Sequence, residues 1–491
     1  MGICRREFSA CLAGAVAARL LPAAVTRPKL LVLVVLQQFR TDYLGLLRSQ
    51  LAPGGLRLLL EKGAVYNDCR NLASTFPSTS IATLATGAWP AQHGIIADNW
   101  YDRALRKVVR GTEEDLLATT LSAQILQETG TSVTVVGLDE TQAALAAGSP
   151  DARIYWMDGE GQMATRGEVP GWLAGYNSQN RVERFHGAKW LALGARNDAP
   201  PLRLLKWSKE NPQDFMAIYR SSPFALGSQF DFVGELINRE RLGQGDALDF
   251  LCILAGSSEL LGYETGADNP LMQQMILQMD RRLEILIGQI TKALGENNFN
   301  LVVVGAHGAP PAPDPDLRDS RVVNGEMLAQ AVDSVLLARG AGRVERYIYP
   351  FFYLDTTKLS DPDRARLVAA RAALEHPAVA SYYTLDGSAS VENDWVVRFR
   401  NSFNAERSGD FMVSYRPERI ELYGQNRGIS YGSLYNYDVQ VPLLLYGPQF
   451  RPGIYRRPVA LTDLAPTLAQ LIDVGSPSSS TGRALVEALA P

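Results

Sequence analysis

Short apolar runs rich in valine and leucine recur along the chain without alternating polar positions. They lie at residues 29–36, 133–138, 249–255, 300–304 and 441–446. Strands of a parallel sheet have this pattern because helices cover both faces of such a sheet. Stretches with helical spacing of apolar residues separate these runs, at residues 116–129, 271–294 and 462–472. The alternation predicts an α/β protein with a doubly wound, mostly parallel central sheet, whose functional groups lie on loops at the carboxyl ends of the strands.

Two regions interrupt this alternation and predict insertions. Residues 155–245 are rich in Trp, Pro, Asn and Arg and have little periodicity, which indicates a cap inserted over the site. In residues 324–423, strand-like pieces flank a helical pattern, which predicts a small α+β insertion. The α/β core is therefore expected to comprise residues 29–154, 246–323 and 424–491.

The amino terminus has a pattern typical of an export signal. Arg5 and Arg6 precede an apolar, alanine-rich stretch at residues 10–18, as in the twin-arginine (Tat) signals that export folded bacterial proteins. A buried helix or a membrane anchor is the other interpretation, but Arg19 interrupts the stretch and a membrane span needs about 20 apolar residues. We therefore predict a Tat-like signal peptide at residues 1–28 and a periplasmic or secreted mature chain without a transmembrane segment.

The composition argues against a nucleic-acid partner and leaves open whether two of the cysteines form a disulfide. The chain has 491 residues, 46% of them hydrophobic, and its formal net charge of −4 gives no electrostatic reason to bind nucleic acid. Of its four cysteines, Cys4 and Cys11 lie in the predicted signal peptide. Cys69 and Cys252 could pair in an oxidising compartment, or Cys252 could be a small core residue of its apolar run.

Residues 71–102 contain the stretch around which the rest of the chain is organised. A Thr-Phe-Pro turn at residues 75–77 leads into a run of small residues at 80–86, which Gly87 closes. The free N–H groups and the dipole at the start of a helix attract anions. Thr75 could therefore face a bound phosphate, or it could cap the helix.

Several motifs follow this turn in a fixed order. They are Thr86-Gly87, Pro90, His93-Gly94-Ile95 and Asn99-Trp100-Tyr101-Asp102. Together with the Thr-Phe-Pro turn, this succession resembles the alkaline phosphatase superfamily, in the branch of the type I phosphodiesterase/nucleotide pyrophosphatases and, most closely, the phosphate-irrepressible alkaline phosphatases. The resemblance covers nearly all of the chain after Lys29 and implies an alkaline-phosphatase-like fold for the core.

Members of that family hydrolyse phosphoesters with two zinc ions and a threonine nucleophile. The resemblance places Thr75 at the nucleophile and Asn99 at a contact to a phosphoryl oxygen. It also implies that most metal ligands are replaced, with Gln37, Glu259 and Ala306 at aspartate positions, Tyr263 and Tyr431 at histidine positions, and His307 retained. One metal would lie among Gln37, Thr75, Ala306 and His307, and the other among Glu259, Tyr263 and Tyr431.

Neither of these sets meets the ordinary requirements of zinc. Glutamine and alanine are not zinc ligands, and tyrosine hydroxyls lose their protons only near about pH 10. The resemblance further implies that Asp139-Glu140-Thr141 stands where the family has a Lys-x-Arg pair that grips the phosphoryl oxygens. Carboxylates at Asp139 and Glu140 and a hydroxyl at Thr141 would repel a phosphate dianion. We therefore expect no metal cofactor and an unactivated Thr75.

These substitutions support three hypotheses. In the first, the chain is an exported, catalytically degenerate member of the superfamily that binds a small molecule or a protein partner. In the second, it is an active metal-dependent phosphoester hydrolase that uses Thr75 as nucleophile and holds one ion by Glu259, Asp139 or Glu140 together with His307. In the third, it is a structural subunit of an assembly. For the degenerate site we expect six side chains to converge and to be joined by direct hydrogen bonds, namely Gln37, Thr75, Glu259, Tyr263, His307 and Tyr431.

Overall fold

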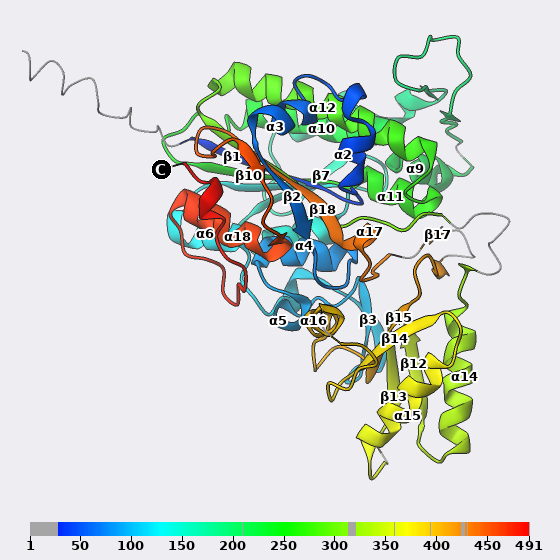
Figure 1. The fold of residues 1–491 in the computed structure, drawn as a ribbon. Helices are drawn as coiled ribbons and strands as arrows, with labels where there is room; N and C mark the ends of the chain where they lie inside the picture. The colour runs from blue at the N-terminus through cyan, green and yellow to red at the C-terminus, as the bar shows by residue number, and fades with distance from the viewer. Residues whose placement is uncertain are drawn as a thin grey trace, which may run out of the picture.

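The computed structural model describes residues 28–208, 210–312, 321–357, 359–392, 394–423, 428–429 and 431–490. Its centre is a ten-stranded sheet in the order β19-β2-β18-β11-β1-β10-β5-β6-β7, in which β20 also pairs with β2 (Figure 1). The strands are β1 (Leu30–Leu36), β2 (Ala64–Arg70), β5 (Val133–Gly137), β6 (Arg153–Met157), β7 (Met163–Thr165), β10 (Asp249–Ala255), β11 (Phe299–Gly305), β18 (Gln440–Tyr446), β19 (Gly453–Tyr455) and β20 (Val459–Ala460). Neighbouring strands pair in parallel except where β18 pairs with β11 and β2 and where β7 pairs with β6. The predicted fold class is therefore confirmed.

Helices cover both faces of this sheet. Alternate residues of β1 point to opposite sides, so that Leu30, Val32 and Val34 lie in one core and Leu31 and Val35 in the other. The first core lies under α3 (Leu56–Lys62), α10 (Pro223–Arg239) and α12 (Pro270–Leu294). The second lies over α4 (Pro77–Thr86), α6 (Leu121–Thr129), α7 (Glu140–Ala147) and α18 (Leu464–Ile472), and Figure 1 shows the two helical layers above and below the sheet.

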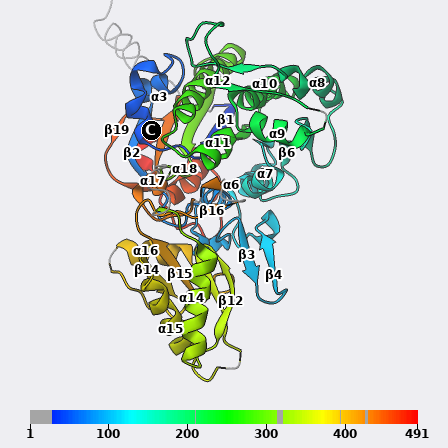
Figure 2. The ribbon, with the colours of Figure 1, turned by 90° about the vertical axis from the view of Figure 1, so that its right-hand side faces the viewer.

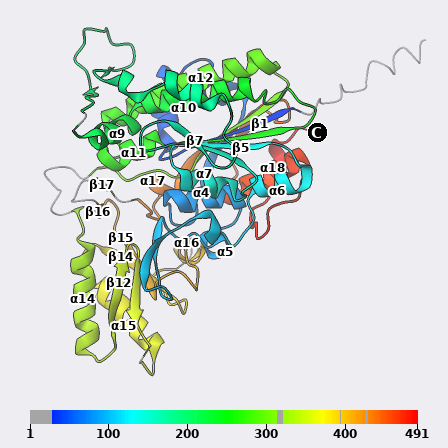
Figure 3. The same cartoon turned by 180° about the vertical axis from the view of Figure 1, so that it is seen from behind.

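A second, four-stranded antiparallel sheet lies in the part of the chain between residues 321 and 423. Its order is β12-β13-β15-β14, formed by β12 (Arg343–Ile348), β13 (Phe351–Asp355), β14 (Val379–Thr384) and β15 (Phe411–Tyr415). Helices α14 (Gly325–Ala338) and α15 (Pro362–Leu374) pack on it through a core of their own, and α16 (Asp394–Ser402) follows β14. Figures 2 and 3 show this unit extending away from the main sheet beside the hairpin of β3 (Asn99–Asp102) and β4 (Lys107–Arg110).

Ion pairs hold the hairpin to this unit. Asp410 is almost completely buried, and it accepts hydrogen bonds from Arg103 at 2.9 Å, from Arg366 at 3.0 Å and from the backbone of Leu354 at 2.7 Å. The ring of Tyr101 also packs edge-on against Tyr353. The β3–β4 hairpin is therefore fixed to this unit by an ion pair and by ring packing.

The region between β6 and β10 contains short strands and three helices. They are β7, α8 (Leu173–Gln179), β8 (Lys189–Trp190), β9 (Arg203–Leu204), α9 (Pro212–Arg220) and α10. Helix α10 packs on the main sheet, where Gln229 donates a hydrogen bond to the carbonyl oxygen of Leu254 at the end of β10, at 2.9 Å. A large part of this region therefore belongs to the same hydrophobic core as α12.

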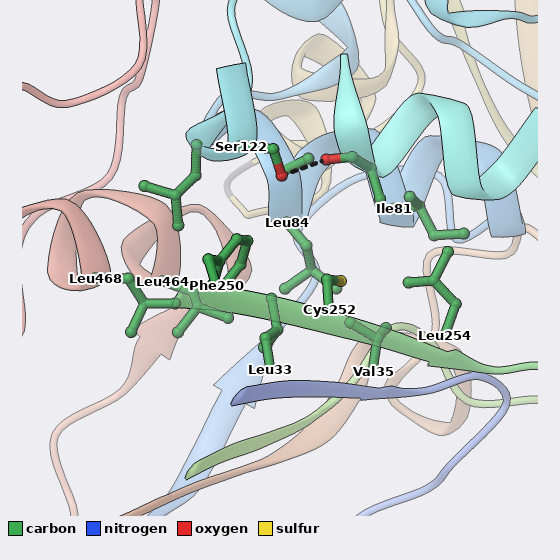
Figure 4. Close-up of a pocket in the computed structure, with 13 residues that line it drawn as sticks. Leu33, Val35, Ile81, Leu84, Ser122, Phe250, Cys252, Leu254, Leu464 and Leu468 are labelled. Carbon is green, nitrogen blue, oxygen red and sulfur yellow. Dashed lines mark hydrogen bonds between the residues drawn. The ribbon is translucent and has the colours of Figure 1, made fainter. Parts of the chain in front are cut away.

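A small cavity lies between β1, β10 and the helices α4, α6, α7 and α18 that cover this face of the sheet (Figure 4). It has a volume of about 20 Å³, and its wall is almost entirely apolar, including Leu33, Phe250 and the thiol of Cys252. The hydroxyl of Ser122 donates to the carbonyl oxygen of Ala146 at 2.9 Å and is thereby satisfied within the wall. A cavity of this kind stays dry and offers a polar ligand no partner.

The described residues bear on the disulfide and the transmembrane segment considered from the sequence. Cys69 and Cys252 are both free and buried, so they do not form the disulfide that the sequence left open. In the part of the chain that the structure describes, no helix is long and apolar enough to span a membrane. The predicted signal peptide at residues 1–28 lies outside the described residues except for its last position.

Candidate functional site

The topology brings most of the predicted site positions to one edge of the main sheet. Strands β11, β1 and β10 are adjacent and parallel, and their carboxyl ends lead directly to Ala306-His307, to Gln37 and to helix α11 (Ser257–Thr265), which carries Glu259 and Tyr263. Strand β18 runs in the opposite direction, so the segment before it, with Tyr431 and α17 (Asn436–Val439), reaches the same edge. Residues that are far apart in sequence therefore share the place where α/β proteins bind ligands.

Gln37 and Glu259 are linked through a residue that the sequence did not single out. Gln37 Nε2 donates to Gln142 Oε1 at 2.9 Å, and Gln142 Nε2 donates to Glu259 Oε2 at 3.4 Å. The link is therefore indirect, whereas a direct hydrogen bond was expected. Burial raises the pKa of Glu259 to about 8, and the nearby carboxylate of Asp98 adds to this shift. One feature could have pointed to Gln142, namely its position three residues after Asp139, which caps helix α7.

Rings from separate segments meet around Tyr431. The ring centroids of His307, Tyr263 and Phe76 lie 5.5, 6.3 and 6.3 Å from that of Tyr431. His307 and Phe76 are buried, whereas Tyr263 and Tyr431 are half-buried and extend the group toward the surface. We call these four side chains the aromatic cluster.

His307 is held in one tautomer by its neighbour. Its Nδ1 lies 2.8 Å from the carbonyl oxygen of Gly308, which can only accept, so Nδ1 carries the proton and Nε2 is a bare acceptor. Burial lowers the pKa of the imidazole to about 4. Nε2 is buried and has no hydrogen-bond partner among the described residues. At neutral pH His307 is therefore an uncharged acceptor.

The hydroxyl of Thr75 is turned toward the backbone of a neighbouring segment. Thr75 Oγ1 donates to the carbonyl oxygen of Ser433 at 3.0 Å, and Asp438 fixes that segment by accepting from the backbone N–H of Ser433 at 3.1 Å. Helix α4 begins at Pro77, and its N-cap residue is Phe76, which makes no side-chain cap. Thr75 is completely buried and lies two residues before the helix, so the interpretation of Thr75 as the cap is wrong.

A carboxylate lies where the start of α4 would attract an anion. Asp98 Oδ1 accepts a hydrogen bond from the backbone N–H of Ser78 at 2.9 Å, in the first turn of the helix. Asn99, which the sequence assigned to a phosphoryl contact, is exposed at the start of β3. The structure thus places Asp98, rather than Asn99, against the helix N-terminus. Burial raises the pKa of Asp98, and the hydrogen bond from Ser78 opposes this shift.

The acidic residues at the family's phosphate grip are paired with arginines. Asp139 is the N-cap of α7 and forms an ion pair with Arg110 of β4 at 2.9 Å. Glu140 forms an ion pair with Arg166 at 2.7 Å. Thr141 lies in the first turn of α7, beside them in sequence. These contacts tie α7 to the hairpin and to β7, and they leave carboxylates where the resemblance implies cations.

The donor set does not fit the two zinc ions that the resemblance implies. Among the described residues, no group of three or more His, Cys, Asp or Glu side chains is placed to hold a metal ion. Ala306 contributes no donor atom, Glu259 is hydrogen bonded to Gln142, and burial raises the pKa of Tyr263 further above that of a free phenol. The residues described at the strand ends therefore do not supply the set of anionic and imidazole ligands that two zinc ions require.

Comparison with protein families identifies the ancestry of this site. The model of the family described as type I phosphodiesterase / nucleotide pyrophosphatase matches residues 31–427. The chain belongs to this family. Its relatives include alkaline phosphatase PafA of Elizabethkingia meningoseptica, with 24% identity over 522 residues that cover 95% of both chains. Alkaline phosphatase PhoV of Synechococcus elongatus is 23% identical over 525 residues, which cover 95% of this chain and 94% of that protein.

Solved structures agree with this placement. The crystal structure of wild-type alkaline phosphatase PafA superposes with a TM-score of 0.81 and 22% identity, over 95% of this chain and 100% of that chain. Similarity at this level establishes the alkaline-phosphatase-like fold, while function depends on the residues of the site. The predicted superfamily and its type I phosphodiesterase branch are confirmed.

Proposed function

We propose that this protein is an exported, catalytically inactive member of the type I phosphodiesterase/nucleotide pyrophosphatase family that retains the fold and binds a ligand or a partner. The observation that carries this proposal is the hydrogen-bonded chain from Gln37 through Gln142 to Glu259, which occupies the strand ends where the family holds metal. Amide groups hydrogen bond to one another and to a carboxyl group there, and an amide is a poor substitute for an anionic zinc ligand. Periplasmic or secreted localisation belongs to the same proposal and rests on the Tat-like sequence around Arg5 and Arg6.

Two further contacts support the loss of hydrolysis. The hydroxyl of Thr75 is engaged with the carbonyl oxygen of Ser433, which accepts the hydrogen bond but cannot act as the base that would activate the hydroxyl. The carboxylate of Asp98 takes the hydrogen bond that the first turn of α4 could offer to a phosphoryl oxygen. A phosphoester would therefore meet negative charge at the helix and a neutral alcohol as the nucleophile.

The alternative is an active hydrolase with an unusual metal centre. The bare Nε2 of His307 favours it, because an imidazole fixed through Nδ1 by a carbonyl oxygen has the orientation of many metal-binding histidines. The names of the alkaline phosphatase relatives favour it as well. Against it, two of the three carboxylates that could assist His307, Asp139 and Glu140, form ion pairs with Arg110 and Arg166. The third, Glu259, accepts a hydrogen bond from Gln142.

A direct test combines metal analysis with an activity assay on the purified mature chain. We expect no stoichiometric zinc after dialysis and no hydrolysis of p-nitrophenyl phosphate or bis-p-nitrophenyl phosphate above background in added zinc, manganese or magnesium. A matched preparation of alkaline phosphatase PafA serves as the positive control. Metal-dependent turnover that disappears in Thr75→Ala would overturn the proposal in favour of the alternative.

A further inference from the structure

The aromatic cluster offers ring faces beside a buried acceptor. Tyr431 lies between Tyr263 and His307, with interplanar angles of 56° and 46°, and Phe76 lies edge-on to Tyr431 at 74°. Tilted rings of this kind present π faces in more than one direction, which is how proteins surround organic cations. Because Tyr263 and Tyr431 are half-buried, one side of the cluster is accessible to solvent.

Several buried polar atoms at the same edge of the sheet lack hydrogen-bond partners in the described part of the chain, and they include acceptors of His307, Gln37 and Asp438 besides the hydroxyl of Ser257. Among the described residues, neither Nε2 of His307 nor Oε1 of Gln37 has a partner. The proton on His307 Nδ1 and the Nε2 group of Gln37 are already committed, to Gly308 and Gln142. A buried acceptor without a partner is energetically unfavourable, so these acceptors favour a ligand that donates hydrogen bonds.

The charges around these acceptors favour a cation over an anion. Glu259 lies at the site, and the carboxylates of Asp98 and Asp139 lie close enough to act on it. Because burial raises the pKa of Glu259 to about 8, this group is mainly protonated at neutral pH, and a bound cation would favour its ionised form. The nearby cations are already engaged. Arg110 pairs with Asp139, Arg40 beside Gly308 pairs with Asp42 and Asp268, and Arg220 donates to the carbonyl oxygen of Leu138 and lowers the pKa of Glu259. An anionic ligand would meet acceptors and carboxylates, whereas a cation would meet ring faces and acceptors.

We propose that the aromatic cluster and the acceptors Gln37 and His307 bind a primary alkylammonium ion. The rings of Tyr263 and Tyr431 would contact the charged end by cation–π interaction, and the N–H groups would reach the buried acceptors. A group with three donors and a positive charge matches this combination better than a metal ion, because the wall is made of rings where a metal would require anionic ligands. The inference deepens the proposed function, since it names the ligand class of the degenerate site.

The experiment measures binding to the full mature chain by isothermal titration calorimetry. n-Butylammonium chloride is the probe, and n-butanol, tetramethylammonium and inorganic phosphate are the comparisons. We expect n-butylammonium to bind, tetramethylammonium to bind more weakly because it donates no hydrogen bond, and n-butanol and phosphate not to bind. Tyr431→Leu removes the central ring but keeps an apolar side chain, and it should weaken n-butylammonium binding roughly tenfold.

Matched variants test whether binding depends on the aromatic ring of Tyr431 itself. Tyr431→Phe keeps the ring and should bind as the wild type does, whereas Tyr446→Leu removes a half-buried ring at the opposite edge of the sheet and should also leave binding unchanged. Circular dichroism establishes that each variant is folded. Equal binding of n-butylammonium and n-butanol, unchanged binding in Tyr431→Leu, or no binding of n-butylammonium to the folded wild type would each overturn the inference.

The same preparations distinguish this inference from the proposed function. If n-butylammonium fails to bind and phosphoester hydrolysis is absent, the ligand class is wrong while the inactive site stands. If zinc-dependent hydrolysis appears, the proposed function is wrong, and displacement of n-butylammonium by zinc would show that both use the same position.

Discussion

The carboxylate of Asp98 accepts a hydrogen bond from the backbone N–H of Ser78 at 2.9 Å, at the first turn of α4. The segment that leads into the β3–β4 hairpin places this carboxylate at the start of a helix. The free N–H groups at such a position can otherwise bind an anionic ligand. The protein thus supplies its own anion at that position. This contact leads to a prediction about phosphate.

Asp98→Asn should make the start of α4 accessible to inorganic phosphate. We expect phosphate to leave the Tm of the wild type unchanged and to raise the Tm of the variant, because removal of the carboxylate removes the competing charge. The variant itself should lose about 1 kcal/mol of stability, the typical cost of a weakened helix cap. Asp102→Asn, on the same hairpin, is the matched control and should show no response to phosphate. An identical phosphate response of the wild type and Asp98→Asn would contradict the prediction.

Gln142→Leu should destabilise the site without touching any residue of the family motifs. The change leaves Gln37 Nε2 without its acceptor and Glu259 without its amide donor, so we expect a loss of about 1–3 kcal/mol in the free energy of unfolding. Urea denaturation provides the measurement. Gln273→Leu, at an exposed position of α12, should change stability by less than about 0.5 kcal/mol. A neutral effect of Gln142→Leu would show that the link contributes nothing to the fold.

His93 should make stability depend on pH below neutrality. The buried imidazole lies 3.0 Å from Thr83 Oγ1 and accepts the backbone N–H of Ile95, and burial lowers its pKa to about 3. In the unfolded chain the imidazole of His93 is protonated below its ordinary pKa of about 6.5, whereas in the folded chain it is protonated only near pH 3. The free energy of unfolding therefore falls as the pH decreases from about 6.5 toward 3. At pH 5 this effect of His93 should lower the free energy of unfolding by about 2 kcal/mol relative to neutral pH.

Chemical denaturation between pH 7.5 and 5 tests this dependence. His93→Gln should be less stable at pH 7.5 and should show a shallower fall with decreasing pH. His186→Gln, at an exposed position, should retain the slope of the wild type. The same slope in His93→Gln and in the wild type would place the pH dependence elsewhere.

Restoring hydrolysis should require many substitutions together. The set comprises Gln37→Asp, Tyr263→His, Ala306→Asp, Tyr431→His, Asp139→Lys, Thr141→Arg and, from the structure, Asp98→Asn. Because groups that act as a unit are strongly non-additive, we expect each single substitution to give no hydrolysis of p-nitrophenyl phosphate in added zinc. Efficient turnover by any single variant would mean that most of the centre is already in place.

The strands and the edge at which the site forms could be predicted from the sequence. The apolar run at residues 29–36 corresponds to β1 at Leu30–Leu36, and that at 249–255 coincides with β10 at Asp249–Ala255. Such runs can be recognised in the sequence because burial on both faces of the sheet excludes polar residues over the whole strand. The motif positions then place Gln37, Glu259 and His307 at neighbouring strand ends.

The partners of these side chains could not be predicted in the same way. Thr75 bonds to Ser433 across 358 positions, and Gln37 bonds to Gln142 across 105, so neither contact leaves a periodic trace in the sequence. Asp98 reaches the backbone N–H of Ser78 because of the way the β3–β4 hairpin lies against the start of α4. Neighbouring residues of an extended segment point to opposite sides, so Asp98 contacts the helix whereas Asn99 is exposed. Side-chain direction in loops is set by tertiary packing, which local pattern does not encode.

The antiparallel course of β18 also fixes when the site can exist during synthesis. Gln37 leaves the ribosome early, but Tyr431 and Ser433 stand before a strand that must insert between β2 and β11. An amino-terminal fragment that ends before β18 would leave β11 with an unpaired edge and would lack the strand that holds the segment of Tyr431 and Ser433 at the edge of the sheet. The site is therefore completed only after almost the whole chain has been made, so a nascent chain cannot bind through it.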